Sequence, residues 1–384
     1  MVFILNTCYS PDDACDVYAY QLAASLIGHG QQVALIHPGK VHKNKKQVAL
    51  QKKGLLFFHL GEQHYSPFFL FRQKLKGYLN WHVLDTEYDR HEIYRHNQRL
   101  WTLAHLLKAH RPARVLIAQG CSLTGLDYAY ICRQLQISYS LFCHQVNEQK
   151  MVLPQERFFM QQAIDGAQQI YFASTSVQHA AASQLDYSAT EPAVFFTPLQ
   201  SPSRSLPMPE TNGELHLLCM GRMDIFDNRP DLLIHLMALE KWRNRPLYLS
   251  FLGEGPNWEG LKELCAFYRL DKVTFLPPSY GLLKALEGHH ALVLAAREGA
   301  YPMEAIEAIS KCRMVIATDV GLIREWVSDG ITGFLGESSL ESLDATWERA
   351  WSQSELWPTM AQKGYEHFRH KYKDSAFQQA MEAL

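Results

Sequence analysis

The sequence lacks three features that would place it in a special class of protein: paired cysteines, a long apolar run and a large net charge. Its eight cysteines are scattered over 384 residues with no CxxC spacing. This argues for free thiols in a reducing compartment and against a zinc or disulfide framework. No apolar run approaches the roughly 20 residues of a membrane span. The net charge of −2 gives no overall field that would attract nucleic acid, so we expect no nucleic-acid partner.

The amino terminus also lacks the features of a secretory signal. An apolar run over residues 2–5 has no basic segment before it and no small-residue cleavage site after it. We therefore expect a cytoplasmic protein, which could still bind peripherally at the inner face of a membrane.

The length favours two domains, because 384 residues exceed one typical core. Strand-like runs alternate with helical runs, which is typical of βαβ units on parallel sheets. The expected strands cover residues 2–5, 32–36, 54–59, 115–118, 138–143, 169–173 and 193–196, and then 215–220, 247–252, 273–276, 291–296, 314–318 and 333–335.

Between the two series, residues 197–213 are rich in Pro, Ser and Gly, as in an interdomain linker. The sequence thus predicts an α/β protein of two doubly wound, Rossmann-like domains facing a cleft. The first spans residues 1–197, the linker 198–213 and the second domain 214–365. A helix over 366–384 is expected to pack back on the first domain.

The most informative segment is a strand-to-helix turn at residues 297–309, with Glu298 before a helix and Glu307 within it. Ligands of open α/β sheets bind at the carboxyl ends of the strands, and a helix start favours phosphate. The two carboxylates could grip hydroxyls on either side of that phosphate, as a sugar nucleotide requires. Alternatively, acids near a helix start only stabilise its dipole, by roughly 0.3–1 kcal/mol each.

Two glycine-containing turns are expected at the same edge of the second sheet. One is Gly221–Arg222 and the other contains Gly253 and Gly255. Glycine permits close approach of a ligand or of another backbone, and the Arg222 guanidinium matches a diphosphate. Glycines also end strands in many α/β proteins, so each turn alone is a weak signal.

Together these motifs resemble the retaining glycosyltransferases of family 4, which have the GT-B architecture. The resemblance is clearest over residues 215–333, through the Gly-Arg turn, the Phe251-Leu-Gly-Glu-Gly255 turn, Glu298-Gly, Glu307-Ala and the run from Val320 to Gly333. The first half matches more loosely, in its first helix and in a strand that ends at His144.

The resemblance implies a role for each matching residue. Glu298 would hold hydroxyls of the donor sugar, Glu307 would bind the ribose, and His144 would point toward the sugar. Catalytic candidates are thus His144 and Glu298. The donor-binding candidates are Arg222, Arg229, Gly253, Phe275, Leu276, Tyr301, Pro302, Met303, Glu304 and Glu307. The resemblance implies neither a metal nor another cofactor, because cationic side chains and a helix start would offset the leaving diphosphate.

The chain departs from the family pattern in three places. Eight residues rather than seven separate Glu298 from Glu307. No lysine stands about five residues after Arg222, and Arg229 is the substitute cation we expect. Asp12 and Asp13 replace a Gly-Gly pair in the first loop, and we expect them on the acceptor side.

A basic and aromatic stretch spans residues 40–76. It has six lysines and no acid up to Lys53, followed by Phe68, Phe69 and Phe71 among further basic residues. Such a pattern suits an anionic membrane surface, although a solvated loop followed by core aromatics would give the same composition.

The sequence therefore predicts an enzyme that moves a sugar from a nucleotide-sugar donor to a glycan or lipid-linked acceptor, with retention of anomeric configuration, in cell-surface polysaccharide or glycolipid biosynthesis. Two alternatives remain open. One is a non-catalytic binding or scaffold protein with a degraded donor site, and the other is an enzyme of different reaction, such as a nucleotide-sugar epimerase or a phosphorylase.

Overall fold

The computed structural model describes residues 1–7, 14–38, 45–60, 90–120, 124–144, 146, 154–185, 193–194, 199, 203–297 and 302–372. These residues form two units. One is built from the described residues up to 194, and the other from those between 199 and 372. Each unit contains one parallel β-sheet, as the sequence predicted.

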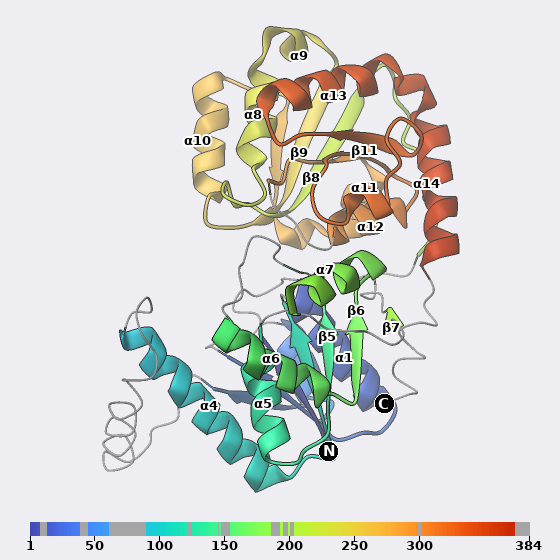
Figure 1. The fold of residues 1–384 in the computed structure, drawn as a ribbon. Helices are drawn as coiled ribbons and strands as arrows, with labels where there is room; N and C mark the ends of the chain where they lie inside the picture. The colour runs from blue at the N-terminus through green and yellow to red at the C-terminus, as the bar shows by residue number, and fades with distance from the viewer. Residues whose placement is uncertain are drawn as a thin grey trace. The chain divides into compact units, whose positions relative to one another are not determined.

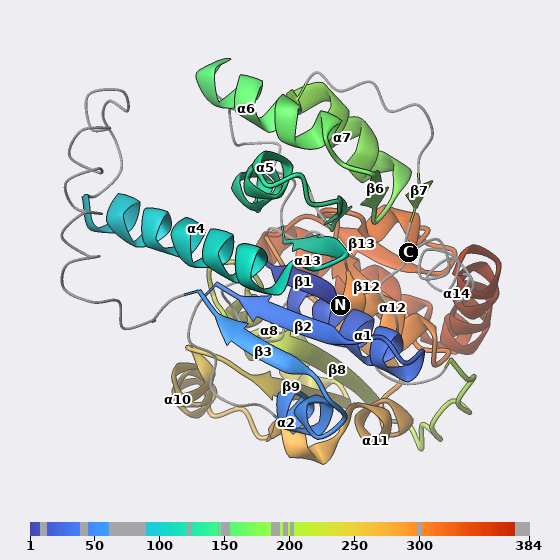
Figure 2. The same ribbon diagram turned by 90° about the horizontal axis from the view of Figure 1, so that it is seen from below.

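The first unit has a seven-stranded parallel sheet of order β3-β2-β1-β4-β5-β6-β7. Its strands are β1 (Val2–Asn6), β2 (Val33–His37), β3 (Leu56–His59), β4 (Arg114–Gln119), β5 (Tyr139–Cys143), β6 (Gln169–Phe172) and β7 (Ala193–Val194). Its helices are α1 (Ala14–Gly28), α2 (Lys45–Gln51), α4 (Arg90–His110), α5 (Leu126–Gln134), α6 (Pro154–Asp165) and α7 (Thr175–Leu185). Figure 2 shows β1, β2 and β3 side by side in this sheet.

The second unit has a six-stranded parallel sheet of order β10-β9-β8-β11-β12-β13 (Figure 1). Its strands are β8 (Leu215–Arg222), β9 (Leu247–Glu254), β10 (Val273–Leu276), β11 (Ala291–Leu294), β12 (Met314–Thr318) and β13 (Gly333–Gly336). Its helices are α8 (Pro230–Ala238), α9 (Glu240–Asn244), α10 (Trp258–Tyr268), α11 (Leu282–Glu287), α12 (Met303–Ile309), α13 (Leu340–Ser352) and α14 (Trp357–Lys371), with short 3₁₀ turns at Pro278–Tyr280, Ile323–Glu325 and Ser354–Leu356.

The strand order of the second sheet reverses at β8. The chain first moves outward through β9 to β10, then returns and adds β11, β12 and β13 on the other side. Because such crossovers are right-handed, α8 and α10 cover one face of the sheet and α12 covers the other. The crevice at the carboxyl ends of β8 and β11 is the usual ligand site of such a sheet.

Gly221, Arg222 and Gly253 lie inside strands rather than in turns after them, which corrects our expectation, whereas Gly255 follows the end of β9. Gly221 pairs with Gly253, and Arg222 pairs with Glu254, in the register of β8 and β9. A β-carbon at residue 253 would overlap the Gly221 carbonyl oxygen, and one at Gly255 would lie 2.6 Å from the Met223 oxygen. The strands continue because two glycines face each other where side chains would not fit.

Much of the expected linker is bound to the second unit. The Leu206 N–H donates to the Lys311 carbonyl at 3.2 Å. The buried Arg313 guanidinium donates to the carbonyls of Leu206 at 3.2 Å, Pro207 at 2.8 Å and Leu286 at 2.7 Å. A single buried side chain thus ties this strap, residues 203–208, to the body of the unit.

The helix α14 runs on to Lys371, past the domain boundary expected at residue 365, and packs on α12 and β12 of the second unit. The remainder of the helix expected over 366–384 lies outside the described residues.

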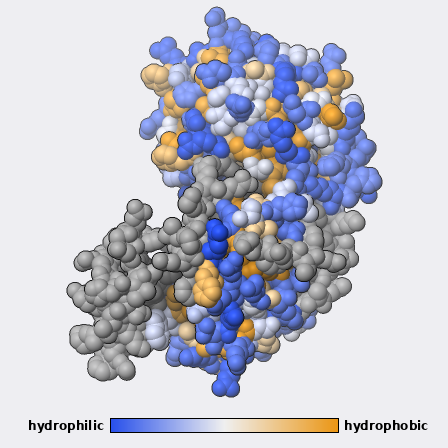
Figure 3. Space-filling view, viewed as in Figure 1, coloured by the Kyte–Doolittle hydropathy of each residue, from blue (hydrophilic) through white to orange (hydrophobic). Residues whose placement is uncertain are grey.

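None of the described helices is both long and apolar enough to cross a membrane. In Figure 3, hydrophilic side chains cover much of the visible face of the second unit, with hydrophobic ones scattered among them.

The close contact between Gly253 and the Gly221 carbonyl allows us to predict the effect of one added methyl group. We expect Gly253→Ala to lower the free energy of unfolding by about 1–3 kcal/mol, because the added carbon overlaps the neighbouring strand. Gly260 in α10 is the matched control, since a β-carbon there meets nothing within 4 Å. Gly260→Ala should be neutral or stabilising by up to about 1 kcal/mol in chemical denaturation. Equal effects of the two substitutions would contradict the close packing of β8 and β9.

We expect that removing the buried Arg313 side chain lowers the stability of the unit and the order of the strap together. Arg313→Ala leaves buried carbonyls without their donor, so we expect about 2–3 kcal/mol of destabilisation in thermal unfolding and faster proteolysis between residues 203 and 208. Arg369→Ala, at an exposed position on α14, serves as the control. An Arg313→Ala protein with unchanged proteolysis would show that other contacts hold the strap.

Candidate functional site

The switch-point crevice of the second sheet is formed by two loops that bond to each other. One loop, residues 223–229, follows β8, and the other begins after β11. The Arg297 N–H donates to the Asp227 carbonyl at 2.7 Å. The two loops are therefore held in one arrangement at the place where an α/β sheet binds its ligand.

The loop after β8 is organised by the buried Asp224. Its carboxylate accepts from the Phe226 N–H at 2.8 Å, and its carbonyl accepts from the N–H groups of Asn228 and Arg229. The Asn257 side chain adds a bond from the Ile225 N–H at 3.1 Å. This loop therefore has little freedom, although Phe226 at its tip is 68% exposed.

The chain after β11 is fixed by its neighbours in the sheet. The Thr318 hydroxyl donates to the Ala296 carbonyl at 2.6 Å, and the Ser338 hydroxyl donates to the Ala295 carbonyl at 3.1 Å. These bonds hold the segment that leads to Glu298. Glu298 and Tyr301 themselves lie outside the described residues.

The helix α12 carries two glutamates, Glu304 and Glu307, in different surroundings. Every residue of α12 except Glu304 is buried. Glu307 is 1% exposed, and its carboxylate lies 3.8 Å from Nζ of the fully buried Lys311. Burial lowers the pKa of Lys311, which the charge of Glu307 partly offsets.

Glu304, in contrast, lies in the first turn of α12 and is only half-buried. A β-carbon at Gly221 would come 2.9 Å from its Oε1 atom, so this carboxylate lies directly over the end of β8. Burial, together with the charge of Glu304, raises the pKa of the Cys219 thiol. The carboxylate near the crevice is thus that of Glu304, whereas the expected ribose ligand Glu307 faces the core.

Three arginines stand at this edge of the sheet. Arg222 is 47% exposed, with its guanidinium 3.7 Å from Asp224. Arg229 binds both carboxylate oxygens of Asp231 at 3.1–3.3 Å. Asp227 stands five residues after Arg222. At this position the family pattern has a lysine, which this chain lacks. The third arginine, Arg297, is exposed, and its N–H bonds to the Asp227 carbonyl. The sequence alone gave it no role.

The expected base-binding residues lie on β10. Phe275 stacks on Phe251 with ring centroids 5.2 Å apart and meets Trp258 edge-on at 5.1 Å. Leu276 pairs with Leu252 in the register of the two strands. The Phe275 ring is therefore occupied by packing, which leaves the backbone of this strand as the group that could meet a base.

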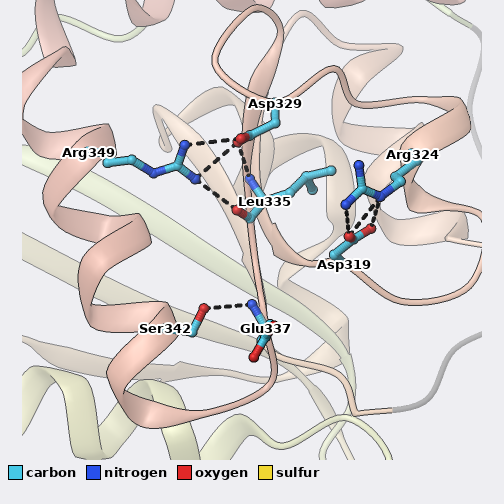
Figure 4. Close-up of polar contacts among 7 residues, drawn as sticks. All are labelled: Asp319, Arg324, Asp329, Leu335, Glu337, Ser342 and Arg349. Carbon is cyan, nitrogen blue, oxygen red and sulfur yellow. Dashed lines mark hydrogen bonds and ion pairs between the residues drawn. The ribbon is translucent and has the colours of Figure 1, made fainter.

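The ends of β12 and β13 carry further ion pairs (Figure 4). Arg324 binds both carboxylate oxygens of Asp319, directly after β12. Arg349 binds Asp329 at 3.0–3.1 Å and also donates to the Leu335 carbonyl, while the Ser342 hydroxyl accepts from the Glu337 N–H at 2.8 Å. These contacts fix the outer part of the same edge.

In the first unit, His144 follows β5 at the carboxyl edge of the sheet. Its Nδ1 lies 3.0 Å from the Gln119 carbonyl and must carry the proton, because a carbonyl only accepts. The ring packs edge-on against Tyr18 at 4.9 Å and is 2% exposed. Burial lowers its pKa to about 4, so the imidazole is neutral at pH 7.

A buried acid that the sequence analysis missed lies at the same edge. Asp16 in α1 is 1% exposed, accepts from the Asn6 amide at 2.6 Å, and lies 3.9 Å from His37 Nε2. A polar Asn at the end of an apolar strand was the available signal. The expected acceptor-side residues Asp12 and Asp13 lie outside the described residues.

The remaining expectations concern a metal and a membrane surface. Within the described ranges, no group of His, Cys, Asp or Glu side chains is arranged to hold a metal ion. Of the basic and aromatic stretch at 40–76, Lys52 and Lys53 are exposed, whereas residues 40–44 and 61–76 lie outside the part of the chain that is described.

Comparison with known proteins agrees with this arrangement. Residues 209–367 match the family model described as Glycosyl transferases group 1. No curated protein sequence matches the chain. Among solved structures, a glycosyltransferase from Rickettsia africae superposes with a TM-score of 0.69 at 14% identity, covering 100% of this chain and 97% of that one.

Two further structures are similar. WaaG, a glycosyltransferase involved in lipopolysaccharide biosynthesis, has a TM-score of 0.69 at 14% identity, with 99% and 98% of the two chains covered. Anabaena HepE in complex with UDP-glucose has a TM-score of 0.66 at 13% identity, with 100% and 98% covered. These comparisons show that the chain has the GT-B fold, and its residues 209–367 match the glycosyl transferases group 1.

Proposed function

We propose that the protein is a glycosyltransferase that moves a sugar from a nucleotide-sugar donor to a glycan or lipid-linked acceptor, with retention of configuration. One observation carries the proposal. In the domain that matches the family, Arg222, Arg297 and Glu304 all stand at the carboxyl ends of the two strands where the strand order reverses, β8 and β11. The binding of UDP-glucose to HepE, which has a similar fold, supports a nucleotide sugar as donor.

At the nucleotide end we propose Glu304, rather than Glu307, as the carboxylate that binds ribose hydroxyls. Glu307 is 1% exposed and lies against Lys311, so a ligand could reach it only by opening the core. Glu304 is half-buried, and its carboxylate lies over Gly221, where a β-carbon would come 2.9 Å from Oε1. The backbone of Phe275 and Leu276 would meet the base.

At the sugar end, Glu298 is proposed to hold donor hydroxyls and His144 to act as a neutral polar group. A neutral imidazole does not supply positive charge, so the leaving diphosphate must be stabilised by other groups. Cationic side chains aimed at such a charge are usually the largest catalytic contribution, and loss of one typically costs about 10²–10³ in rate. We propose that these cations, and no metal, perform this task.

Our proposals for the acceptor side are supported by fewer observations. Asp12 and Asp13 are proposed to face the acceptor. A lipid-linked acceptor would agree with peripheral binding of residues 40–76 to anionic membranes at the cytoplasmic face. The comparison with WaaG, described as acting in lipopolysaccharide biosynthesis, supports a cell-surface glycan as product.

A thermal-shift panel of UDP, GDP, ADP and their common sugar conjugates tests the proposal. A ligand at 100 times its dissociation constant should stabilise the protein by about 2.7 kcal/mol. Glu304→Gln and Arg222→Ala should weaken the binding of the active nucleotide about tenfold or more, because each removes a charged partner. Glu307→Gln should instead lower stability and leave nucleotide affinity nearly unchanged.

The outcomes separate the alternatives. Absence of any shift would favour a scaffold with a degraded donor site. Conversion of a nucleotide sugar without an added acceptor would favour an epimerase. A loss of affinity in Glu307→Gln but not in Glu304→Gln would restore the assignment drawn from the family resemblance.

The buried His144 predicts a pH dependence of stability. Above pH 6.5 the ring is neutral in both the folded and unfolded states. Between pH 6.5 and about 4 the unfolded chain binds a proton that the folded one does not, so the free energy of unfolding falls by up to about 3 kcal/mol. In His144→Gln this fall should be smaller, although His290, whose pKa burial also lowers to about 4, keeps its share. An equally steep profile in urea denaturation of the variant would contradict a neutral, buried His144.

A further inference from the structure

We propose that Arg297 is a phosphate-binding residue of the nucleotide-sugar site and contacts the diphosphate of the donor. This assignment rests on the proposed function and adds to it the group that neutralises the leaving phosphate. It follows from where the backbone holds Arg297 and from how the neighbouring charges are already used.

The peptide group that joins Ala296 to Arg297 is fixed by two hydrogen bonds. Its own N–H donates to the Asp227 carbonyl at 2.7 Å, and the preceding carbonyl, of Ala296, accepts from the Thr318 hydroxyl at 2.6 Å. The residue thus projects from a rigid point between the loops after β8 and β11, and its side chain is exposed. A charged group held in this way needs little reorganisation when a ligand binds.

The other two arginines of this edge share their charge with carboxylates of the same unit. Arg229 binds both oxygens of Asp231, and Arg222 lies 3.7 Å from Asp224. For Arg297, no ion pair with another described residue is found. Its charge is therefore the most available of the three for an incoming anion.

The crevice needs such a cation. The segments at the carboxyl ends of β8 and β11 carry three acidic residues, Asp224, Asp227 and Glu304, of which Asp224 is already paired with Arg222 at 3.7 Å. Negative charge near a bound diphosphate would repel it. A guanidinium can bind two phosphate oxygens with parallel hydrogen bonds, which a single ammonium cannot do with the same geometry. Arg297, bonded through its own backbone to the loop that carries two of those acids, is placed to offset them.

Calorimetry with UDP, UMP and uridine, and in parallel with GDP, GMP and guanosine, tests this assignment. In the series that binds wild type, Arg297→Gln should weaken the diphosphate about 10- to 100-fold and the monophosphate less, and should leave the nucleoside unchanged. The loss of diphosphate affinity should shrink in 0.5 M NaCl, because salt screens an exposed charge. Arg297→Lys should recover part of the affinity, and Arg369→Gln is the control at an exposed arginine on α14.

Two results would overturn the proposal. One is unchanged diphosphate affinity in Arg297→Gln, and the other is an equal loss for diphosphate and nucleoside, which would mean a distorted loop. If Arg222→Ala weakens the diphosphate and Arg297→Gln does not, only this assignment fails and the proposed function stands. If wild type binds none of UDP, GDP and ADP, the proposed function fails and the assignment of Arg297 fails with it.

Discussion

The reversal of strand order at β8 is the constraint on which the second unit depends. Because all strands are parallel and their crossovers are right-handed, the loops after β8 and β11 diverge to opposite faces and leave a crevice between them. The hydrogen bond from Arg297 to the Asp227 carbonyl closes the base of that crevice. Within the described part of this unit, Arg222, Arg297 and Glu304 lie at this edge because topology leads their strand, loop or helix there.

The distribution of charge at this edge explains which residues remain for a ligand. Several arginine–carboxylate pairs, including Arg229 with Asp231 and Arg324 with Asp319, hold loops in place and are matched within the unit. The pair of Glu307 and Lys311 is buried completely and belongs to the core. The described charges of this edge are therefore largely paired within the unit, and the partly exposed Arg222, Arg297 and Glu304 are the groups that our proposal assigns to ligand recognition.

Two features of the structure change how the motifs are understood. The glycines of the Gly-Arg and Gly-Glu-Gly motifs first permit β8 and β9 to approach each other, since a β-carbon at Gly253 would overlap the facing carbonyl. The strap at 203–208 is held by Arg313, close to the carboxyl end of α12, so this part of the expected interdomain linker belongs to the second unit. The glycine motifs and the strap therefore both contribute to packing within the second unit.

The sequence by itself determined the fold class, the strands within a few residues and the edge of the sheet that carries the site, because apolar periodicity and the position of glycines are local properties. It placed the clearest family resemblance at residues 215–333, and the family model matches residues 209–367, which include them. Only the tertiary structure decided which glutamate faces the crevice, which arginines are already paired and whether the linker is bound. Those outcomes depend on where α12 begins and on contacts between segments distant in the chain. A shift of the helix start by one residue turns a side chain by about 100°, from core to crevice, and no spacing in the sequence fixes it.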